Sequence, residues 1–305
     1  MVAYTLRRLG LMVVTVIGVT IVVFIAARLS GDVTYLIAPQ DATPAELARI
    51  RTELGLDRPI WIQYWRFIEG LMSGDFGESI RYRRPAMELI LSRLPATVQL
   101  AVTAFTISTV LGIWLGVASA RRRGTWIDDL IRMGAVLGQS MPNFWIGTMA
   151  ILLFAVVLGW LPTSGREGWQ HLVLPAATLG VFTMAAIMRI TRSAMLQTMD
   201  TEYIKFLRVK GVPEGTIIWK HALRNSLIPV LALAGIQLGN LLGGTVIVET
   251  VFSWPGIGSV MIEAITNRDY PLIQAGVLLV SLLLISLNLI VDLLFAVIDP
   301  RIRYD

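Results

Sequence analysis

Long apolar stretches separated by polar segments run through most of the chain. Each approaches or exceeds the roughly 20 residues that a helix needs to cross the hydrocarbon core of a bilayer. They cover residues 9–27, 95–119, 133–159, 172–190, 227–250 and 272–298. The stretch at 172–190 contains Pro175 and Gly180, which membrane helices tolerate when neighbouring helices satisfy the freed backbone groups. The pattern predicts an all-α integral membrane protein with six transmembrane helices.

Composition supports this prediction. Hydrophobic residues make up 55% of the 305 and charged residues only 15%, whereas roughly a quarter of the residues in soluble domains are charged. The sequence contains no cysteine, which excludes disulfides, thiolate metal sites and a cysteine nucleophile. The net charge of +5 could suggest nucleic-acid binding, but in so apolar a chain an uneven distribution of loop charges explains it better.

The first apolar stretch has two interpretations. Arg7 and Arg8 precede it, as basic residues precede the apolar region of a secretory signal peptide. The stretch is closer to the length of a membrane span than to the 7–15 residues of a typical signal, and no small-x-small cleavage site stands before Arg28. We therefore predict a retained first helix.

The distribution of Lys and Arg predicts the orientation. Most of them lie in the N-terminus, the loops after the second and fourth predicted helices and the C-terminal tail. The two short loops on the other side hold one each, Arg166 and Arg268. Because cytoplasmic loops are enriched in Lys and Arg, both termini and the segment 200–229 are predicted to be cytoplasmic.

Residues 30–94 form a predicted extracytoplasmic insert between the first two spans. Thr43, a proline and Glu46 have the spacing of a capping box, and Gly55 is placed to end the helix that follows. A second helix is predicted after Pro59, with its apolar positions on one face: Ile60, Tyr64, Phe67 and Leu71. The insert is either a lid over the membrane core or a surface that meets a substrate-delivering partner.

The segment 200–229 is far longer than a connection between two spans requires. It is basic and helix-forming, and Gly211 and Pro213 divide it into two short amphipathic pieces. Such a segment suits docking to a partner. The alternative is a solvated basic loop that only follows the charge distribution of cytoplasmic loops.

Short strings along nearly the full length form a recognisable ordered set. They are Tyr4–Leu9, Leu54–Pro59, Gly74–Ser79, Arg93–Thr97, Gly159–Pro162, Leu174–Ala176, Arg189–Ser193, Phe252–Gly258, Asn267–Pro271 and Asp299–Tyr304. Together they resemble the permeases of peptide and nickel ABC importers, and specifically the first of their two permease subunits. Dipeptide and glutathione importer permeases are the most similar.

The resemblance implies a bacterial inner-membrane permease subunit, with a first helix at 1–29, the insert at 30–94 and a five-helix permease core at 95–305. With a second permease it would form a path for di- or oligopeptides delivered by an extracytoplasmic binding protein. ATP and Mg would bind to two partner ATPase subunits, because this chain has no GxxxxGK[ST] motif. We expect no enzyme activity and no bound cofactor.

Other transport functions stay open. The same machine could carry nickel, glutathione or an oligosaccharide, which relatives also carry. A different class, a secondary transporter driven by an ion gradient, would require charged groups near the bilayer midplane. Only Glu249 and Asp292 approach such positions.

The resemblance also implies that 200–229 is a coupling loop, whose two short helices at 202–210 and 219–226 dock into a groove of the ATPase. The expected contact residues are Glu202, Tyr203, Lys205, Arg208, Lys210, Gly211, Trp219, His221, Arg224 and Asn225. Leu207 and Val209 stand where relatives usually have small residues, so we expect a correspondingly roomier groove.

Polar residues within the spans are candidates for the translocation path. Gln237 and Asn240 lie three positions apart and are predicted to share a face of the fifth helix. Nearby glycines could line the path or allow close helix packing: Gly235, Gly239, Gly243 and Gly244. His171 and His221 are predicted on opposite sides of the membrane, and no metal site or catalytic residue is predicted.

Overall fold

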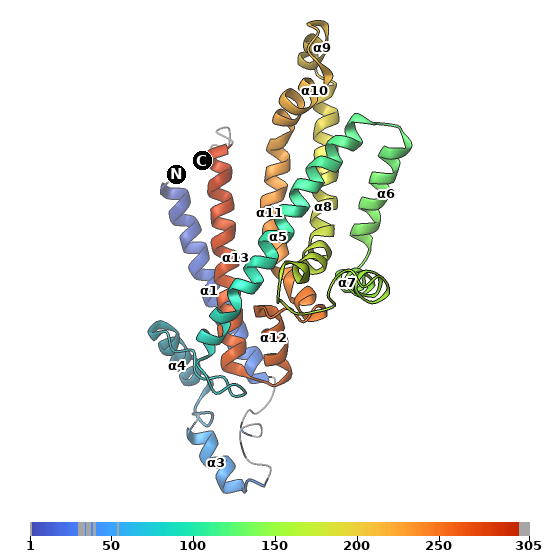
Figure 1. Cartoon of the computed structure of the whole chain (residues 1–305). Helices are drawn as coiled ribbons and strands as arrows, with labels where there is room; N and C mark the ends of the chain where they lie inside the picture. Colours follow the sequence, from blue (N-terminus) through green and yellow to red (C-terminus); the bar gives the residue numbers. More distant parts are fainter. Residues whose placement is uncertain (1, 30–33, 35–37, 39–40, 54, 299–305) are drawn as a thin grey trace. The chain divides into compact units, whose positions relative to one another are not determined.

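The computed structural model describes residues 2–29, 34, 38, 41–53 and 55–298, and these residues contain no β-strand. The C-terminal string at 299–305 and the side chain of Asp292 lie outside the described part. The chain, whose helices are drawn in Figure 1, divides into two compact units. One comprises Met1–Pro95 and Ser259–Ser286, and the other comprises Ala96–Gly258 and Leu287–Asp305.

The first unit contains α1, α3 and α4, which span Val2–Leu29, Pro44–Glu53 and Ile60–Ser73. The capping box before α3 is confirmed. The Thr43 N–H donates to Glu46 Oε2 at 2.8 Å, and the Glu46 N–H donates to Thr43 Oγ1 at 3.3 Å. Gly74 ends α4 in the left-handed conformation, with φ 77°, which glycine adopts without steric cost.

Hydrogen bonds join the segment after α4 to the corner between α12 (Ile257–Thr266) and α13 (Tyr270–Ile298). Ser79 donates to the buried carboxylate of Asp269. The Tyr82 hydroxyl donates to Glu263 at 2.6 Å. Partial burial, followed by this hydrogen bond, raises the pKa of Tyr82.

The second unit is a bundle of long helices. Its elements are α5 (Ala86–Arg121, which begins in the first unit), α6 (Trp126–Ser140), α7 (Asn143–Ala150), the π-helix η1 (Ile151–Val157), α8 (Trp169–Met199), α9 (Glu202–Val209), α10 (Glu214–Thr216), the π-helix η2 (Ile217–Ala222) and α11 (Leu223–Val251). α5 and α8 approach closely, because a Cβ at Gly116 would lie 2.8 Å from the Met188 carbonyl oxygen. The expected domain boundary at 94/95 lies inside α5.

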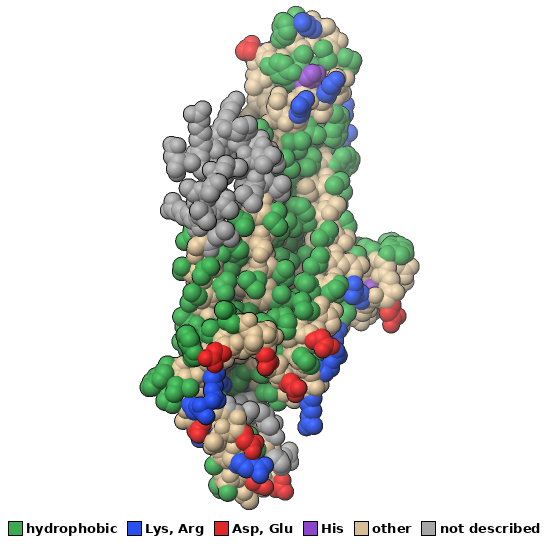
Figure 2. All heavy atoms as spheres, turned by 90° about the vertical axis from the view of Figure 1, so that its left-hand side faces the viewer, with side chains coloured by type: hydrophobic (Ala, Val, Ile, Leu, Met, Phe, Trp, Pro, Cys, Tyr) green, Lys and Arg blue, Asp and Glu red, His purple; other side chains and the backbone are tan. Residues whose placement is uncertain are grey.

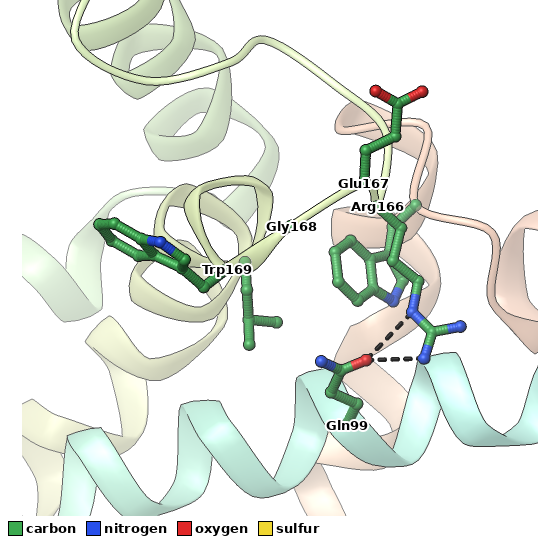
Figure 3. Close-up of a pocket in the computed structure, with 7 residues that line it drawn as sticks. Gln99, Arg166, Glu167, Gly168 and Trp169 are labelled. Atoms are coloured by element: carbon green, nitrogen blue, oxygen red, sulfur yellow. Dashed lines mark hydrogen bonds between the residues drawn. The ribbon is translucent and has the colours of Figure 1, made fainter.

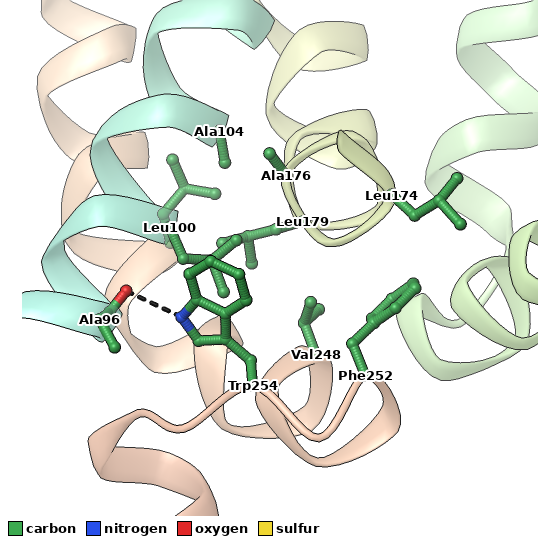
Figure 4. Close-up of a cluster of buried hydrophobic side chains, with 10 residues drawn as sticks. Ala96, Leu100, Ala104, Leu174, Ala176, Leu179, Val248, Phe252 and Trp254 are labelled. Atoms are coloured by element: carbon green, nitrogen blue, oxygen red, sulfur yellow. Dashed lines mark hydrogen bonds between the residues drawn. The ribbon is translucent and has the colours of Figure 1, made fainter. Parts of the chain in front are cut away.

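One of the buried clusters that make up the core of this bundle is centred on Trp254 (Figure 4). Its indole is fully buried and donates to the Ala96 carbonyl at 2.9 Å. Leu100 of α5, Leu179 of α8 and Val248 of α11 surround it. Through its hydrogen bond the indole holds the turn after α11 against α5 at Ala96, the first residue of α5 that belongs to the second unit.

Within the part of the chain that the structure describes, four helices are long and apolar enough to cross a membrane: Ala86–Arg121, Trp169–Met199, Glu214–Val251 and Tyr270–Val291. They correspond to the second, fourth, fifth and sixth predicted spans. In the described part of α1 the apolar stretch is shorter, Gly10–Ala26. Figure 2 shows hydrophobic side chains covering the long helices, with charged side chains beyond them at the end of the second unit that carries α9.

The third predicted span, 133–159, is not one continuous helix in the structure. α6 and the α7–η1 helix meet there at an angle of 110°. Met141 is extended, with φ −92° and ψ 136°, and Pro142 follows it. A proline disfavours the helical conformation of the residue before it and lacks an N–H of its own, so the helix breaks here. By length and composition, the described residues therefore hold four helices that could cross a membrane, or up to five if the bent pair is one span.

Candidate functional site

The segment between α8 and α11 begins with the short helix α9. Thr201 precedes it in an extended conformation, and its carbonyl accepts the first helical hydrogen bond from Ile204 at 3.1 Å. After α9 the chain turns at Gly211, where φ is +76°. Pro213 then starts the next helix. The predicted turn at Gly211 is thus present, since this conformation strongly favours glycine.

The second predicted piece, 219–226, is not a separate short helix. α10, η2 and α11 follow one another without a break, so Glu214–Val251 forms one long helix. Its only early glycine, Gly215, lies in the first turn, and no proline occurs before Pro229. The backbone therefore has no residue that would end a helix near 226.

The inner face of this segment is part of the bundle core. Ile204, Ile217 and Ala222 are completely buried and pack with Val117 of α5 and Met195 of α8. Burial of one such isoleucine stabilises the fold by roughly 1.5–3 kcal/mol. The segment is therefore held to two long helices through its apolar side chains.

The outer face carries the ten residues expected to contact a partner. Nine are exposed and His221 is half-buried. Tyr203 and His221 form a pair in which the tyrosine hydroxyl lies 2.7 Å from Nδ1. Two ion pairs lie beside them, Lys205 with Glu202 at 2.8 Å and Arg208 with Glu214 at 2.9 Å. The hydrogen bond to Glu202 raises the pKa of Lys205, which stays charged at neutral pH.

Two apolar residues on the same face lie within the helix 202–210 that was expected to dock, but outside the ten named contact residues. Phe206 is 55% exposed and Val209 is 86% exposed, and the Lys210 ammonium lies 4.6 Å from the Phe206 ring centroid. Tyr203, Phe206 and Val209 recur every three residues, which is a signal available in the sequence. Leu207 packs against the buried cluster instead. Of the two bulky residues expected to need a roomier groove, only Val209 is on the outer face.

A buried ion pair ties α6 to α8. The Asp128 carboxylate is 1% exposed and accepts two hydrogen bonds from Arg192, at 2.7 and 2.9 Å. Ser119 of α5 and the backbone N–H of Gly124 also donate to it. The hydrogen bonds to Asp128 thus connect the ends of α5, α6 and α8. The two partners are 64 positions apart, so no local pattern in a single sequence reveals the pair.

Glu249 contacts residues of α5 and of the turn after α11. It is fully buried, and its carboxylate accepts a hydrogen bond from Thr97 at 2.7 Å. Thr97 in turn accepts the N–H of Ile257 at 2.8 Å. A Cβ at Gly256 would overlap the Glu249 carboxylate. Through these contacts Glu249 and Thr97 hold the turn after α11 in place.

A pocket of about 390 Å³ lies beside this turn (Figure 3). Arg166 lines it and donates two hydrogen bonds to Gln99 Oε1, at 2.7 and 3.0 Å. Its guanidinium carbon lies 5.7 Å from the Trp254 ring centroid. Glu167 and Trp169 complete the polar and aromatic rim. The arrangement can accept a small polar group, but its arginine is already engaged by the chain itself.

The path candidates Gln237 and Asn240 do share a face of α11. The Asn240 amide donates to Gln237 Oε1 at 3.0 Å, and Asn240 is exposed whereas Gln237 is 5% exposed. Among the neighbouring glycines, a Cβ placed at Gly239 would lie 3.3 Å from Asn288 Oδ1, and one placed at Gly244 would lie 3.3 Å from Leu179 Cδ1. These two allow close packing, whereas no heavy atom lies within 4 Å of a Cβ placed at Gly243.

The long apolar helices, the polar residues within them and the amphipathic surface at one end of the bundle define a class, the multi-pass helical membrane proteins. The family model described as binding-protein-dependent transport system inner membrane component matches residues 108–304. The model of the N-terminal part of the same components matches residues 1–101. The chain therefore belongs to this family and is a permease subunit of an ABC transporter.

Two curated relatives match over their full length and that of this chain. The dipeptide transport system permease protein DppB of Alkalihalophilus pseudofirmus is 41% identical over 333 residues. The glutathione transport system permease protein GsiC of Salmonella paratyphi A is 43% identical over 305 residues.

Two solved structures share the fold. An inward-facing structure of the MetNI methionine ABC transporter has a TM-score of 0.58 at 20% identity, covering 70% of this chain and 97% of the other. An amino acid ABC transporter solved with histidines has a TM-score of 0.53 at 16% identity, covering 70% and 94%.

Proposed function

We propose that the chain is the first of two permease subunits in an ATP-driven importer of small peptides. The curated relatives carry a dipeptide and glutathione, and glutathione is itself a tripeptide. Full-length identity above 40% to both supports a cargo of this size and chemistry. In this proposal an extracytoplasmic binding protein delivers the peptide, and two ATPase subunits that bind ATP and Mg drive the transport.

The proposed topology has six membrane spans in total. α1 is the first span, and the bent α6 and α7–η1 pair is the third. Both termini and the 200–229 segment are cytoplasmic, as the distribution of Lys and Arg favours. The domains in this proposal are 1–29, the extracytoplasmic insert 30–94 and the permease core 95–305.

The outer face of α9 and η2 is the proposed coupling surface. One observation carries the proposal: ten candidate contact residues lie on a segment whose other face is buried in the bundle core. A partner that binds the outer face moves α5 and α8 with it, because buried anchors such as Ile217 transmit the displacement. Gln237 and Asn240 are proposed as path residues on α11.

Two substitutions of Gly211 test the coupling surface. The position has φ +76°, and no heavy atom lies within 4 Å of an added Cβ. Asparagine tolerates this conformation, so Gly211→Asn is a near-isosteric, neutral control for Gly211→Asp. In a pull-down of the solubilised complex, we expect both ATPases and the second permease to co-purify with wild type and Gly211→Asn. Gly211→Asp places a carboxylate on a surface whose cations suit an acidic groove, and we expect it to lose the ATPases.

A chain that purifies alone in all three forms, with uptake that follows an ion gradient, would overturn the proposal. Uptake in cells that hold the complete system then tests the cargo. We expect unlabelled glutathione or dipeptides to compete with a labelled dipeptide, and nickel or oligosaccharide to leave its uptake unchanged.

A further inference from the structure

Helix α4 presents three distinct faces. With 3.6 residues per turn, its residues fall into one packed apolar face, one exposed apolar face and one polar face. The packed face contains Tyr64, Phe67 and Leu71. The exposed apolar face contains Trp61, Trp65, Ile68 and Met72, of which the two tryptophans and the methionine are 70%, 63% and 84% exposed. The third, mainly polar face contains Gln63, Arg66, Glu69 and Ser73, with Ile62 among them.

The packed face fixes α4 against α1. The ring centroid of Phe24 lies 5.3 Å from that of Tyr64 and 5.9 Å from that of Phe67. The Tyr64 hydroxyl lies 3.0 Å from Thr20 Oγ1. Phe24 is about 7.5 Å along the helix axis from the end of α1 at Leu29, at 1.5 Å per residue. α4 therefore lies beside the last turns of α1.

The polar face is held by hydrogen bonds to the turn before α4. The Gln63 amide donates to the carbonyl oxygens of Leu56 and Arg58, at 3.2 and 2.7 Å. These bonds fix the rotation of α4 relative to the turn before it. The tryptophan face consequently points sideways from α1, next to the face that α1 covers, and α1 itself exposes apolar side chains such as Val14 and Ile17.

We propose that α4 is an interfacial helix whose Trp61, Trp65 and Met72 side chains are embedded in the lipid of the outer leaflet. The inference rests on the proposed function, in which α1 crosses the membrane. Tryptophan is enriched where a membrane meets water, and a helix with one apolar and one polar face lies in that plane. The helix α1, on which α4 packs, also exposes apolar side chains, so the proposed occupant of the exposed apolar face of α4 is lipid.

Spin labels on introduced cysteines can test this directly, since the natural chain has no cysteine. Met72→Cys places the label on the tryptophan face, and the neighbouring Ser73→Cys places it on the polar face. Val14→Cys, on an exposed position of α1, tests the span itself. Each labelled variant is assembled into the complete transporter in phosphatidylcholine vesicles. The measurement is the rate at which the label collides with oxygen, which concentrates in lipid, and with a nickel chelate, which stays in water.

We expect the label at 72 to favour oxygen and the label at 73 to favour nickel, a reversal between adjacent residues. Nickel-favoured collisions at both 72 and 73 would overturn the inference, as would low collision rates with both reagents at 72, which indicate a covering protein. If the label at 14 also favours nickel, the proposed first span fails as well. If it favours oxygen, a negative result at 72 counts against the interfacial helix alone.

Discussion

Two helical segments that connect apolar stretches are attached to the protein in opposite ways. The coupling surface at α9 and η2 rests on fully buried side chains such as Ile204 and Ile217, whereas no residue of α3 or α4 is fully buried. The first segment is part of a core, whereas the second is held by one face of α4 and by hydrogen bonds, including those of Ser79 and Tyr82 to Asp269 and Glu263. A segment that transmits a displacement needs the first kind of attachment, because packed cores shift as units.

A charge in the buried face of the coupling segment should have the largest effect. In Ile217→Asp a carboxylate replaces a fully buried isoleucine that packs with Val117 and Met195. Burial of an unpaired polar group costs roughly 2–7 kcal/mol, and an ionised one costs more. We expect the thermal unfolding temperature of the purified chain to fall sharply and the ATPases to be lost.

Val209→Asp is the matched control, because Val209 is 86% exposed in the same segment. It should leave the unfolding temperature close to wild type. Equal unfolding temperatures for Ile217→Asp and Val209→Asp would show that the two faces do not differ in burial.

Removal of one partner of the buried ion pair should have the next largest effect. Arg192→Ala leaves Asp128 charged and 1% exposed, and breaking a buried pair in this way costs about 3–5 kcal/mol. The double variant with Asp128→Ala should recover part of the loss, which denaturant unfolding of all three variants can measure. Asp129→Ala removes only an exposed pair with Arg132 and is expected to cost about 1 kcal/mol or less. A double variant less stable than Arg192→Ala would contradict the assigned pairing.

Local patterns in the sequence predicted local structure well. The capping box at Thr43, the apolar face of α4 and the turn at Gly211 each depend on a few adjacent residues. The structure contains the first and the third. Of the predicted face of α4, Tyr64 and Phe67 pack on Phe24, whereas Ile60 is 52% exposed. The break at Pro142 was also visible locally, but an average of hydropathy over a long window hides it.

Long-range pairing could not be predicted in this way. Arg192 is one of several arginines near the end of its helix, and only the folded bundle brings Asp128 to it. The direction of Leu207 was likewise decided by tertiary packing, because α9 has apolar residues on both its inner and its outer face. The assignment of the outer face to an ATPase stays a prediction.

An exposed aromatic residue on the coupling surface should matter for binding rather than for folding. Trp219 is 50% exposed, and an aromatic anchor at the centre of an interface typically contributes about 2 kcal/mol or more to binding. We expect Trp219→Ala to weaken ATPase binding, measured by titration of the solubilised permease, with an unchanged unfolding temperature. Trp169→Ala removes a tryptophan that is 73% exposed and lies outside the coupling segment, and it should leave the affinity unchanged. Equal affinities in the two variants would exclude Trp219 from the interface.

The smallest expected effect is a pH-dependent loosening of α3. The hydrogen bond from the Thr43 N–H, followed by that from its hydroxyl, lowers the pKa of Glu46 from its ordinary value of 4.5. A carboxylate whose pKa is depressed in the folded state contributes stability above its unfolded pKa, and this is lost as the pH falls through the folded value. Below about pH 4.5, amide hydrogen exchange in α3, corrected for its intrinsic pH dependence, should therefore quicken. α9 provides the comparison in the same sample, because no side chain caps its N-terminus and its buried face holds it. Glu46→Gln can keep the capping geometry without the titration, so its α3 exchange should vary less with pH. If α3 and α9 loosen equally in wild type, the local capping bonds are not what holds α3, and its attachment resembles that of the coupling segment after all.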